Sequence, residues 1–160
     1  MIAAVRRANL FACEFEYDDG DPAGYHSAVA EVGKAAGGME LAVKFFELPA
    51  GQSLCPYHYE YVEEWLLVLE GTPVVRVPDG EEQLKPGDLV SFSPGPEGAH
   101  KVMNPGDETA RVLMFSSSRE PAVAVYPDSD KIGVWPGNRE DNVMLRREDG
   151  QRDYWDGETG

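Results

Sequence analysis

Short apolar runs, each closed by a glycine or proline turn, dominate the chain of 160 residues. Its 17 glycines and 12 prolines leave little room for long helices, because both residues disfavour a helix interior. Closely spaced β-rich runs with turn residues between them are typical of a sandwich or a barrel. The sequence therefore predicts an all-β domain with strands over residues 11–17, 39–48, 65–69, 73–77, 88–92, 99–103 and 109–116.

The segment before the main group of strands has weak helical character. Residues 27–36 are rich in alanine and include Glu31, but Gly33 and the pair at 37–38 limit a helix there to a turn or two. We therefore expect residues 1–38 to supply a strand and a short helical turn that pack against a barrel formed by residues 39–117.

The segment after the barrel loses the regular strand pattern but keeps aromatic side chains. Trp135, Tyr154 and Trp155 all lie in it. So aromatic a composition is unlike that of a disordered chain. Residues 118–160 are therefore predicted to form an irregular aromatic tail that wraps the barrel or a partner subunit, with fraying only in the last four residues.

Charge and apolar content restrict the partners of this chain. Its net charge of −15 at pH 7 repels nucleic acid and anionic lipid surfaces, and its apolar runs fall short of the roughly 20 residues that span a bilayer. Residues 1–13 lack the apolar stretch of a signal peptide, so we expect a cytoplasmic protein without nucleic acid or membrane partners. Cys13 and Cys55 are expected to be free thiols, because disulfides are rare in the cytosol.

Ionisable residues gather beside the most apolar run. His58 and Glu60 are two positions apart, so on an extended strand their side chains leave one face while those of the neighbouring tyrosines leave the other. Glu64 enters the run 65–69, which is apolar on both faces and therefore expected to be buried on both. A carboxylate at that position needs a cation, a hydrogen-bond donor or a raised pKa. A divalent metal ion would meet this need.

Two motifs in this region resemble those of the cupin superfamily. The first, usually written G-x5-H-x-H-x3-4-E-x6-G, is matched by Gly51, His58, Glu60, Glu64 and Gly71. The second, usually written G-x5-P-x-G-x2-H-x3-N, is matched by Gly87, Pro94, His100 and Asn104. The resemblance covers about residues 39–117. It departs from the family at Glu60, which replaces the second histidine, and in two spacings that each differ by one residue.

The resemblance implies a double-stranded β-helix, the cupin or jelly-roll barrel, with a divalent metal ion inside. Position by position, His58, Glu64 and His100 correspond to the metal ligands of the family. We infer Glu60 as a fourth ligand, because a carboxylate oxygen is acceptable to Fe, Mn, Ni or Zn at a mixed nitrogen and oxygen site.

The implied function is that of a metalloenzyme of dioxygenase, decarboxylase or isomerase type, with a small molecule bound inside the barrel. The alternative is a non-catalytic barrel that binds or senses a small ligand. Phosphosugars look less suited as substrates, because the cations in or beside the motifs are Arg76, Lys85 and Lys101 alone, and two carboxylate ligands leave the metal site little net charge.

Several residues near the motifs have competing interpretations. Glu63 is the rival of Glu64 as the acidic ligand and would fit if His58 were the second histidine of the motif, but Pro56 would then replace the first. His26 is expected at the surface. Cys55 either lines the mouth of the barrel or, as we favour, is a buried and inert thiol.

The run 65–69 also predicts the oligomeric state. Because it is apolar on both faces, a lone barrel would leave one of these faces in water. The sequence therefore predicts a homodimer.

Overall fold

The computed structural model describes residues 5–159, so residues 1–4 of the predicted N-terminal segment and Gly160 of the tail lie outside it. The chain forms three antiparallel sheets. The largest has six strands, in the order β1 (Glu16–Tyr17), β2 (Ala28–Ala30), β3 (Leu41–Leu48), β10 (Ala110–Ser117), β5 (Glu64–Glu70) and β8 (Leu89–Phe92).

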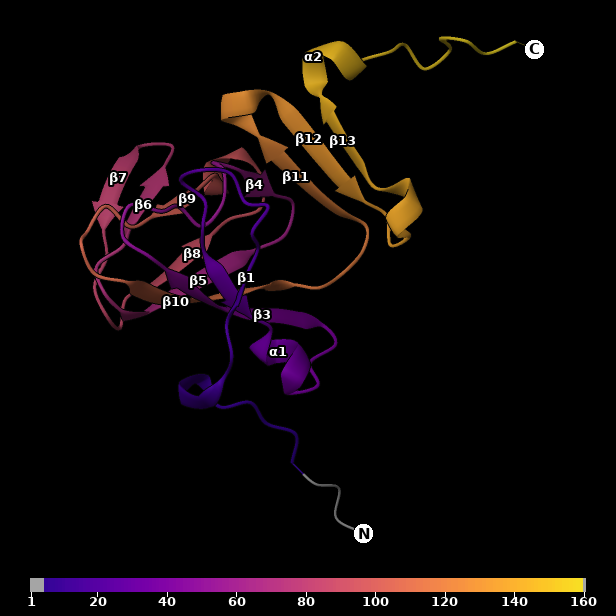
Figure 1. Cartoon of the computed structure of the whole chain (residues 1–160). Coiled ribbons are helices and arrows are strands. Elements are labelled where there is room, and N and C mark those ends of the chain that lie inside the picture. The colour runs from indigo at the N-terminus through magenta and orange to yellow at the C-terminus, as the bar shows by residue number, and fades with distance from the viewer. Residues whose placement is uncertain (1–4, 160) are drawn as a thin grey trace.

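The second layer of the barrel is a three-stranded sheet in the order β7 (Gly80–Gln83), β6 (Val74–Val77) and β9 (Lys101–Met103). A four-stranded sheet in the order β13 (Val143–Arg146), β12 (Lys131–Trp135), β11 (Ala122–Tyr126) and β4 (Tyr59–Glu60) lies at one end of the barrel, as Figure 1 shows. Short helices complete the fold: α1 (Val32–Ala35), α2 (Arg147–Gly150) and the 3-10 turns η1 (Leu10–Ala12), η2 (Pro96–Gly98), η3 (Pro127–Ser129) and η4 (Arg139–Asp141). None of the helices in residues 5–159 has the length and apolar character needed to cross a membrane.

The core lies between the large sheet and the β6–β9 layer. Leu66, Val68 and Val112 from the large sheet pack with Val75 and Val102 from the opposite layer, and each is almost fully buried. Side chains alternate between the two faces of a strand, so Leu66 and Val68 lie on one face of β5, and Val112 lies beside Val68 on the same face. This face is the one that points into the barrel. The same alternation decides which residues of β3, β5 and β10 line the functional site.

Strand β5 is covered on both faces, as its sequence predicts, but the second face is partly covered by the chain itself. Leu66 and Val68 face the barrel core, whereas Leu67 and Leu69 pack on a separate cluster that includes Leu10 and other residues of the N-terminal segment. The N-terminal residues therefore act as part of the domain, with α1 lying against β3.

The segment after residue 117 is more regular than the sequence suggests. It contains β11, β12 and β13, and β11 pairs with the barrel strand β4. Five-residue strands are too short for a clear alternating pattern, and their stability depends on pairing with a strand some 60 positions earlier in the chain. Val125 and Ile132 pack on Tyr57 and Tyr59, while every described residue beyond 135 is exposed.

Two truncations should separate the packed and exposed parts of this segment. A chain ending after Arg146 loses a segment whose described residues, 147–159, are all exposed, so we expect its free energy of unfolding to change by less than about 0.5 kcal/mol. A chain ending after Ser118 uncovers Tyr57 and Tyr59, and should lose about 2 kcal/mol or more. Urea unfolding of both chains tests this. Identical transitions would show that β11 and β12 do not stabilise the barrel.

Candidate metal centre

A short β-bridge brings together two histidines that lie far apart in the sequence. The His58 amide donates to the His100 carbonyl at 3.1 Å, and the His100 amide donates to the His58 carbonyl at 2.8 Å. Directly opposed residues of an antiparallel pair have neighbouring side chains. The two imidazole rings accordingly lie with their centres 4.8 Å apart.

The local backbone that presents His100 is tightly packed. The turn η2 precedes it, and a side chain at Gly98 would overlap the Ser93 carbonyl, so glycine is required there. The His100 ring then stacks on Phe92, with ring centres 3.6 Å apart and planes at 8°. The imidazole of His100 is fully buried and held in one orientation.

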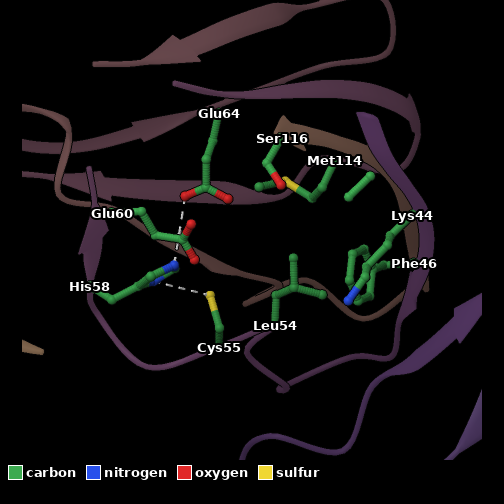
Figure 2. A pocket seen from close by; sticks show the side chains of 10 residues that line it. Lys44, Phe46, Leu54, Cys55, His58, Glu60, Glu64, Met114 and Ser116 are labelled. Carbon is green, nitrogen blue, oxygen red and sulfur yellow. Dashed lines mark hydrogen bonds and ion pairs between the residues drawn. The ribbon is translucent and has the colours of Figure 1, made fainter. Parts of the chain in front are cut away.

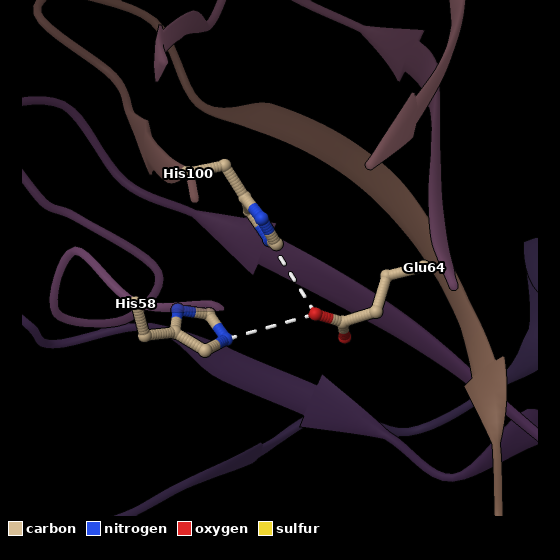
Figure 3. Close-up of side chains that lie close together, drawn as sticks. All are labelled: His58, Glu64 and His100. Carbon is tan, nitrogen blue, oxygen red and sulfur yellow. Dashed lines mark ion pairs between the residues drawn. The ribbon is translucent and has the colours of Figure 1, made fainter. Parts of the chain in front are cut away.

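Glu64, the first residue of β5, points its carboxylate between the two rings, as Figure 3 shows. Its Oε2 lies 3.8 Å from Nε2 of His58 and 3.8 Å from Nε2 of His100. One candidate ligand atom from each residue lies within 4.8 Å of the others, a grouping that can hold a metal ion. The structure thus brings together three of the four residues singled out in the sequence.

Main-chain carbonyls fix the tautomer of both histidines. Nδ1 of His58 lies 3.0 Å from the Pro56 carbonyl oxygen, and Nδ1 of His100 lies 2.9 Å from that of Gly98. Because a carbonyl oxygen only accepts hydrogen bonds, each Nδ1 carries the proton and each Nε2 presents a lone pair. A backbone carbonyl holding one imidazole nitrogen is the usual support for a histidine whose other nitrogen binds metal.

The ionisation of the three residues also favours a cation. Burial lowers the pKa of His58 and lowers that of His100 to about 4, so both are neutral near pH 7. Burial, and then the nearby Glu60, raise the pKa of Glu64 to about 8. No group within residues 5–159 hydrogen bonds to Nε2 of His100, although it is buried. Two imidazole nitrogens and a carboxylate are a donor set that suits Fe, Mn, Ni or Zn.

Glu60 shares the cavity but lies outside the grouping of three. His58 and Glu60 both line the cavity, whereas Tyr57 and Tyr59 pack in a separate cluster, which is the alternation predicted for this strand. Burial raises the pKa of Glu60, and Lys44 opposes that rise. The assignment of Glu60 as a fourth ligand therefore stays a prediction.

The cavity, with a volume of about 220 Å³, opens beside this centre (Figure 2). It is lined by Ala42, Lys44, Phe46, Leu54, Cys55, His58, Glu60, Glu64, Met114 and Ser116. Drug-sized ligands occupy pockets of roughly 300–1,000 Å³, so this one suits a smaller molecule.

The competing residues have clear positions. Glu63 is exposed and accepts a hydrogen bond from Nε1 of Trp65 at 2.6 Å, so Glu64 rather than Glu63 lines the cavity. His26 is exposed and packs on Tyr17. Cys13 and Cys55 are both free, as expected. Cys55 lines the cavity with Sγ 3.6 Å from Nδ1 of His58, and burial raises its pKa to about 12, so it is a neutral thiol there.

Two residues at the centre lie outside the sequence motifs. The Tyr126 ring, from β11, stacks on His58 with centres 5.8 Å apart and planes at 24°. Lys44, from β3, lines the cavity. The alternation of β3 places Lys44 on the face of the buried Leu48, which is a signal in the sequence that could have found it. Tyr126 is positioned by long-range strand pairing and left no such signal.

Comparison with known proteins finds a family model that matches the barrel. Residues 44–116 match the family model described as the Cupin domain. No curated protein matches the sequence. A sugar phosphate isomerase from the cupin superfamily of Silicibacter pomeroyi superposes with a TM-score of 0.76 and 24% identity, over 92% of this chain and 96% of that one.

Two further solved structures share the fold. A protein of Acidithiobacillus ferrooxidans, proposed to be a sugar phosphate isomerase, gives a TM-score of 0.76 and 22% identity over 88% of each chain. A polyketide cyclase of Streptomyces resistomycificus gives 0.62 and 21%, over 74% of this chain and 84% of that one. At these identities the likeness concerns the fold.

The raised pKa of Glu64 predicts how the stability of the metal-free protein depends on pH. The folded protein holds this proton up to about pH 8, whereas an unfolded chain releases it near pH 4.3, about its ordinary pKa. The free energy by which the protonated Glu64 stabilises the folded protein is therefore complete below about pH 4.3 and is lost as pH rises through 8. The lowered pKa of His100 acts in the opposite direction, between about pH 4 and 6.5.

Between pH 6.5 and 8, the free energy of unfolding should thus fall by roughly 1.4 kcal/mol per pH unit. Urea unfolding of metal-free protein at several pH values measures this slope. Glu64→Gln should flatten it, and Glu63→Gln, at an exposed position, should leave it unchanged. A wild-type stability that is constant over this range would contradict the raised pKa.

Proposed function

We propose that residues 44–116, which match the Cupin domain model, bind a divalent metal ion through His58, Glu64 and His100 and act as an enzyme on a small molecule in the adjacent cavity. The metal is proposed to be Fe, Mn, Ni or Zn, with Glu60 as the candidate for a fourth ligand.

The observation that carries this proposal is the buried, unpartnered Nε2 of His100. A buried polar atom without a partner costs free energy, and such atoms call for a bound group. Its lone pair points at the Glu64 carboxylate, which cannot donate a hydrogen bond when ionised, and the separation of 3.8 Å is too long for one in any case. A cation between the two would partner both.

The bound ion and the residues that line the cavity would have separate roles in the reaction. A bound divalent ion supplies Lewis-acid polarisation of a substrate oxygen. Phe46, Leu54 and Met114 form apolar walls that exclude water from the substrate. Glu60, whose pKa is raised towards neutrality, can hold or accept a proton from the substrate within the same cavity.

Among the reaction types implied by the sequence, we propose isomerisation. Moving a hydrogen between neighbouring carbon atoms needs a polarised substrate oxygen and a group that exchanges a proton. A divalent ion at His58, Glu64 and His100 would polarise the oxygen, and Glu60, whose pKa burial raises, can exchange the proton. The sugar phosphate isomerase of Silicibacter pomeroyi and the protein of Acidithiobacillus ferrooxidans proposed to be one share the fold over most of their length, which supports this choice.

Metal content after purification tests the proposed ligands. We expect His100→Ala and Glu64→Gln to lower metal affinity more than about 100-fold, since even residues that only support a ligand cost 10–100-fold. His26→Ala and Glu63→Gln are matched controls at exposed positions. Elemental analysis and metal titration provide the measurements. Full metal content in His100→Ala would exclude the proposed site.

Glu60 has its own test within that experiment. If it is a ligand, Glu60→Ala should reduce metal content and Glu60→His should restore it as a three-histidine site. If Glu60→Ala keeps its metal while His100→Ala loses it, Glu60 is a free carboxylate of the cavity and its role is proton transfer. A wild-type protein that takes up none of the four metals would favour the alternative of a non-catalytic binding barrel.

We also propose a cytoplasmic homodimer. The N-terminal segment covers only part of the outer face of the large sheet, because Leu41, Trp65 and Leu89 remain 60%, 36% and 57% exposed on it. Light scattering should report twice the chain mass of 17.6 kDa. Leu89→Glu should yield a monomer, because a charge in an apolar interface is costly, with little effect on the folded barrel. A wild-type monomer at micromolar concentration would contradict the dimer.

A further inference from the structure

Lys44 is an inward-facing lysine on a barrel strand. It lies in β3 opposite Met114 of β10, on the same face as Phe46 and the fully buried Leu48. Side chains on this face point into the barrel, and Lys44 lines the cavity near its open end. Among the ten residues that line this cavity, Lys44 is the one lysine or arginine.

The position of Lys44 gives the cavity two chemically different sides. Figure 2 shows His58 and Glu60 on one side and Lys44 with Phe46 across the cavity from them. Leu54 and Met114 contribute apolar surface between these sides, and Ser116 adds a hydroxyl. A ligand that reaches the metal centre therefore has room to extend towards the ammonium group.

The ammonium group of Lys44 has one exposed, weakly held partner. Its neighbour Glu31 lies 3.5 Å away, and the two side chains are 44% and 51% exposed. Such an exposed pair contributes only about 0–1 kcal/mol, so Lys44 can exchange Glu31 for another anion at little cost. Lys44 also lies close enough to Glu60 and Glu64 to oppose the rise in pKa that burial causes in both. A divalent ion would offset those two carboxylates, so that the exposed Glu31 would remain as the partner of the lysine charge.

We propose that this cavity selects small hydroxylated molecules that carry one anionic group, a phosphate or a carboxylate, and that Lys44 binds this group while the oxygen-bearing end lies at the centre of His58, Glu64 and His100. The inference rests on the proposed function, because it adds a substrate class to the same site. A chain with a net charge of −15 repels anions at long range, so a cation within the cavity is needed to select one.

This inference revises the expectation that phosphosugars suit the chain poorly. That expectation counted the cations in or beside the motifs, of which Arg76 is paired with Asp128 through two hydrogen bonds of 2.6 and 3.0 Å. Lys101 packs on Tyr25 and donates a hydrogen bond to its hydroxyl. The cation that matters, Lys44, lies 14 residues before His58, on strand β3 and outside both motifs.

Three probes with the same three-carbon skeleton test the inference: glycerol 3-phosphate, glycerate and glycerol. Calorimetric titration of the wild-type protein, with and without added Mn²⁺, should give tighter binding of the two anions than of glycerol. Lys44→Met should weaken the binding of the favoured anion at least tenfold and leave glycerol binding and metal content unchanged. Lys44→Arg should retain most of the affinity, and Glu31→Gln should increase it. The comparison of phosphate with carboxylate identifies which anion the site prefers.

The outcomes separate this inference from the proposed function. Unchanged anion affinity in Lys44→Met, or glycerol binding as tight as that of both anions, would overturn the inference and leave the metal site standing. Loss of metal in Lys44→Met would also overturn it, because the lysine would then be part of the metal centre. A wild-type protein without metal uptake whose anion binding still depends on Lys44 would overturn the metal site and keep the anion site.

Discussion

The buried carboxylate of Glu64 is the constraint on which the centre depends. It lies at the start of the most apolar strand of the barrel and faces two imidazoles that are neutral near pH 7. An ionised carboxylate in such surroundings is costly, so without a cation Glu64 keeps its proton. Two backbone carbonyls that hold the Nδ1 atoms, and the bridge that aligns His58 with His100, make the remaining nitrogens converge on this carboxylate. Each of these features is explained if the three side chains share a divalent ion.

The segment beyond the cupin match supports this centre from outside the barrel. Strand β11 pairs with β4 beside His58, and Tyr126 at its end stacks on the His58 ring. Two residues later, Asp128 is held by Arg76 of β6, whose guanidinium also lies over the ring of Tyr57. The C-terminal sheet is therefore connected to the barrel by strand pairing, by an aromatic contact and by an ion pair. Strand pairing at Glu60 and the stacking of Tyr126 on His58 thus join two motif residues to a segment that lies outside the motifs.

Charge, as well as shape, determines which small molecules this cavity can bind. The net charge of the chain repels anions at long range, whereas a divalent ion would offset Glu60 and Glu64, so that Lys44 would place positive charge in the same cavity. Interactions between charges are stronger there than at the surface, because the apolar walls lower the local dielectric constant. Specificity for an anionic small molecule would therefore arise from few groups, and the reaction would be set by how Glu60 and the metal are placed around it.

The sequence by itself determined the all-β barrel, the alternation that puts His58 and Glu60 on one face, and the choice of Glu64 over Glu63, because these follow from strand periodicity and motif spacing. It also predicted Glu60 as a fourth metal ligand, which stays a prediction, since a carboxylate in this cavity can either bind a metal or carry a proton. Only the tertiary structure decided that β11 would pair with β4, that Tyr126 would stack on His58 and that Lys44 would share a cavity with them. These contacts join residues distant in the chain, and no local pattern encodes a pairing whose stability comes from the partner strand.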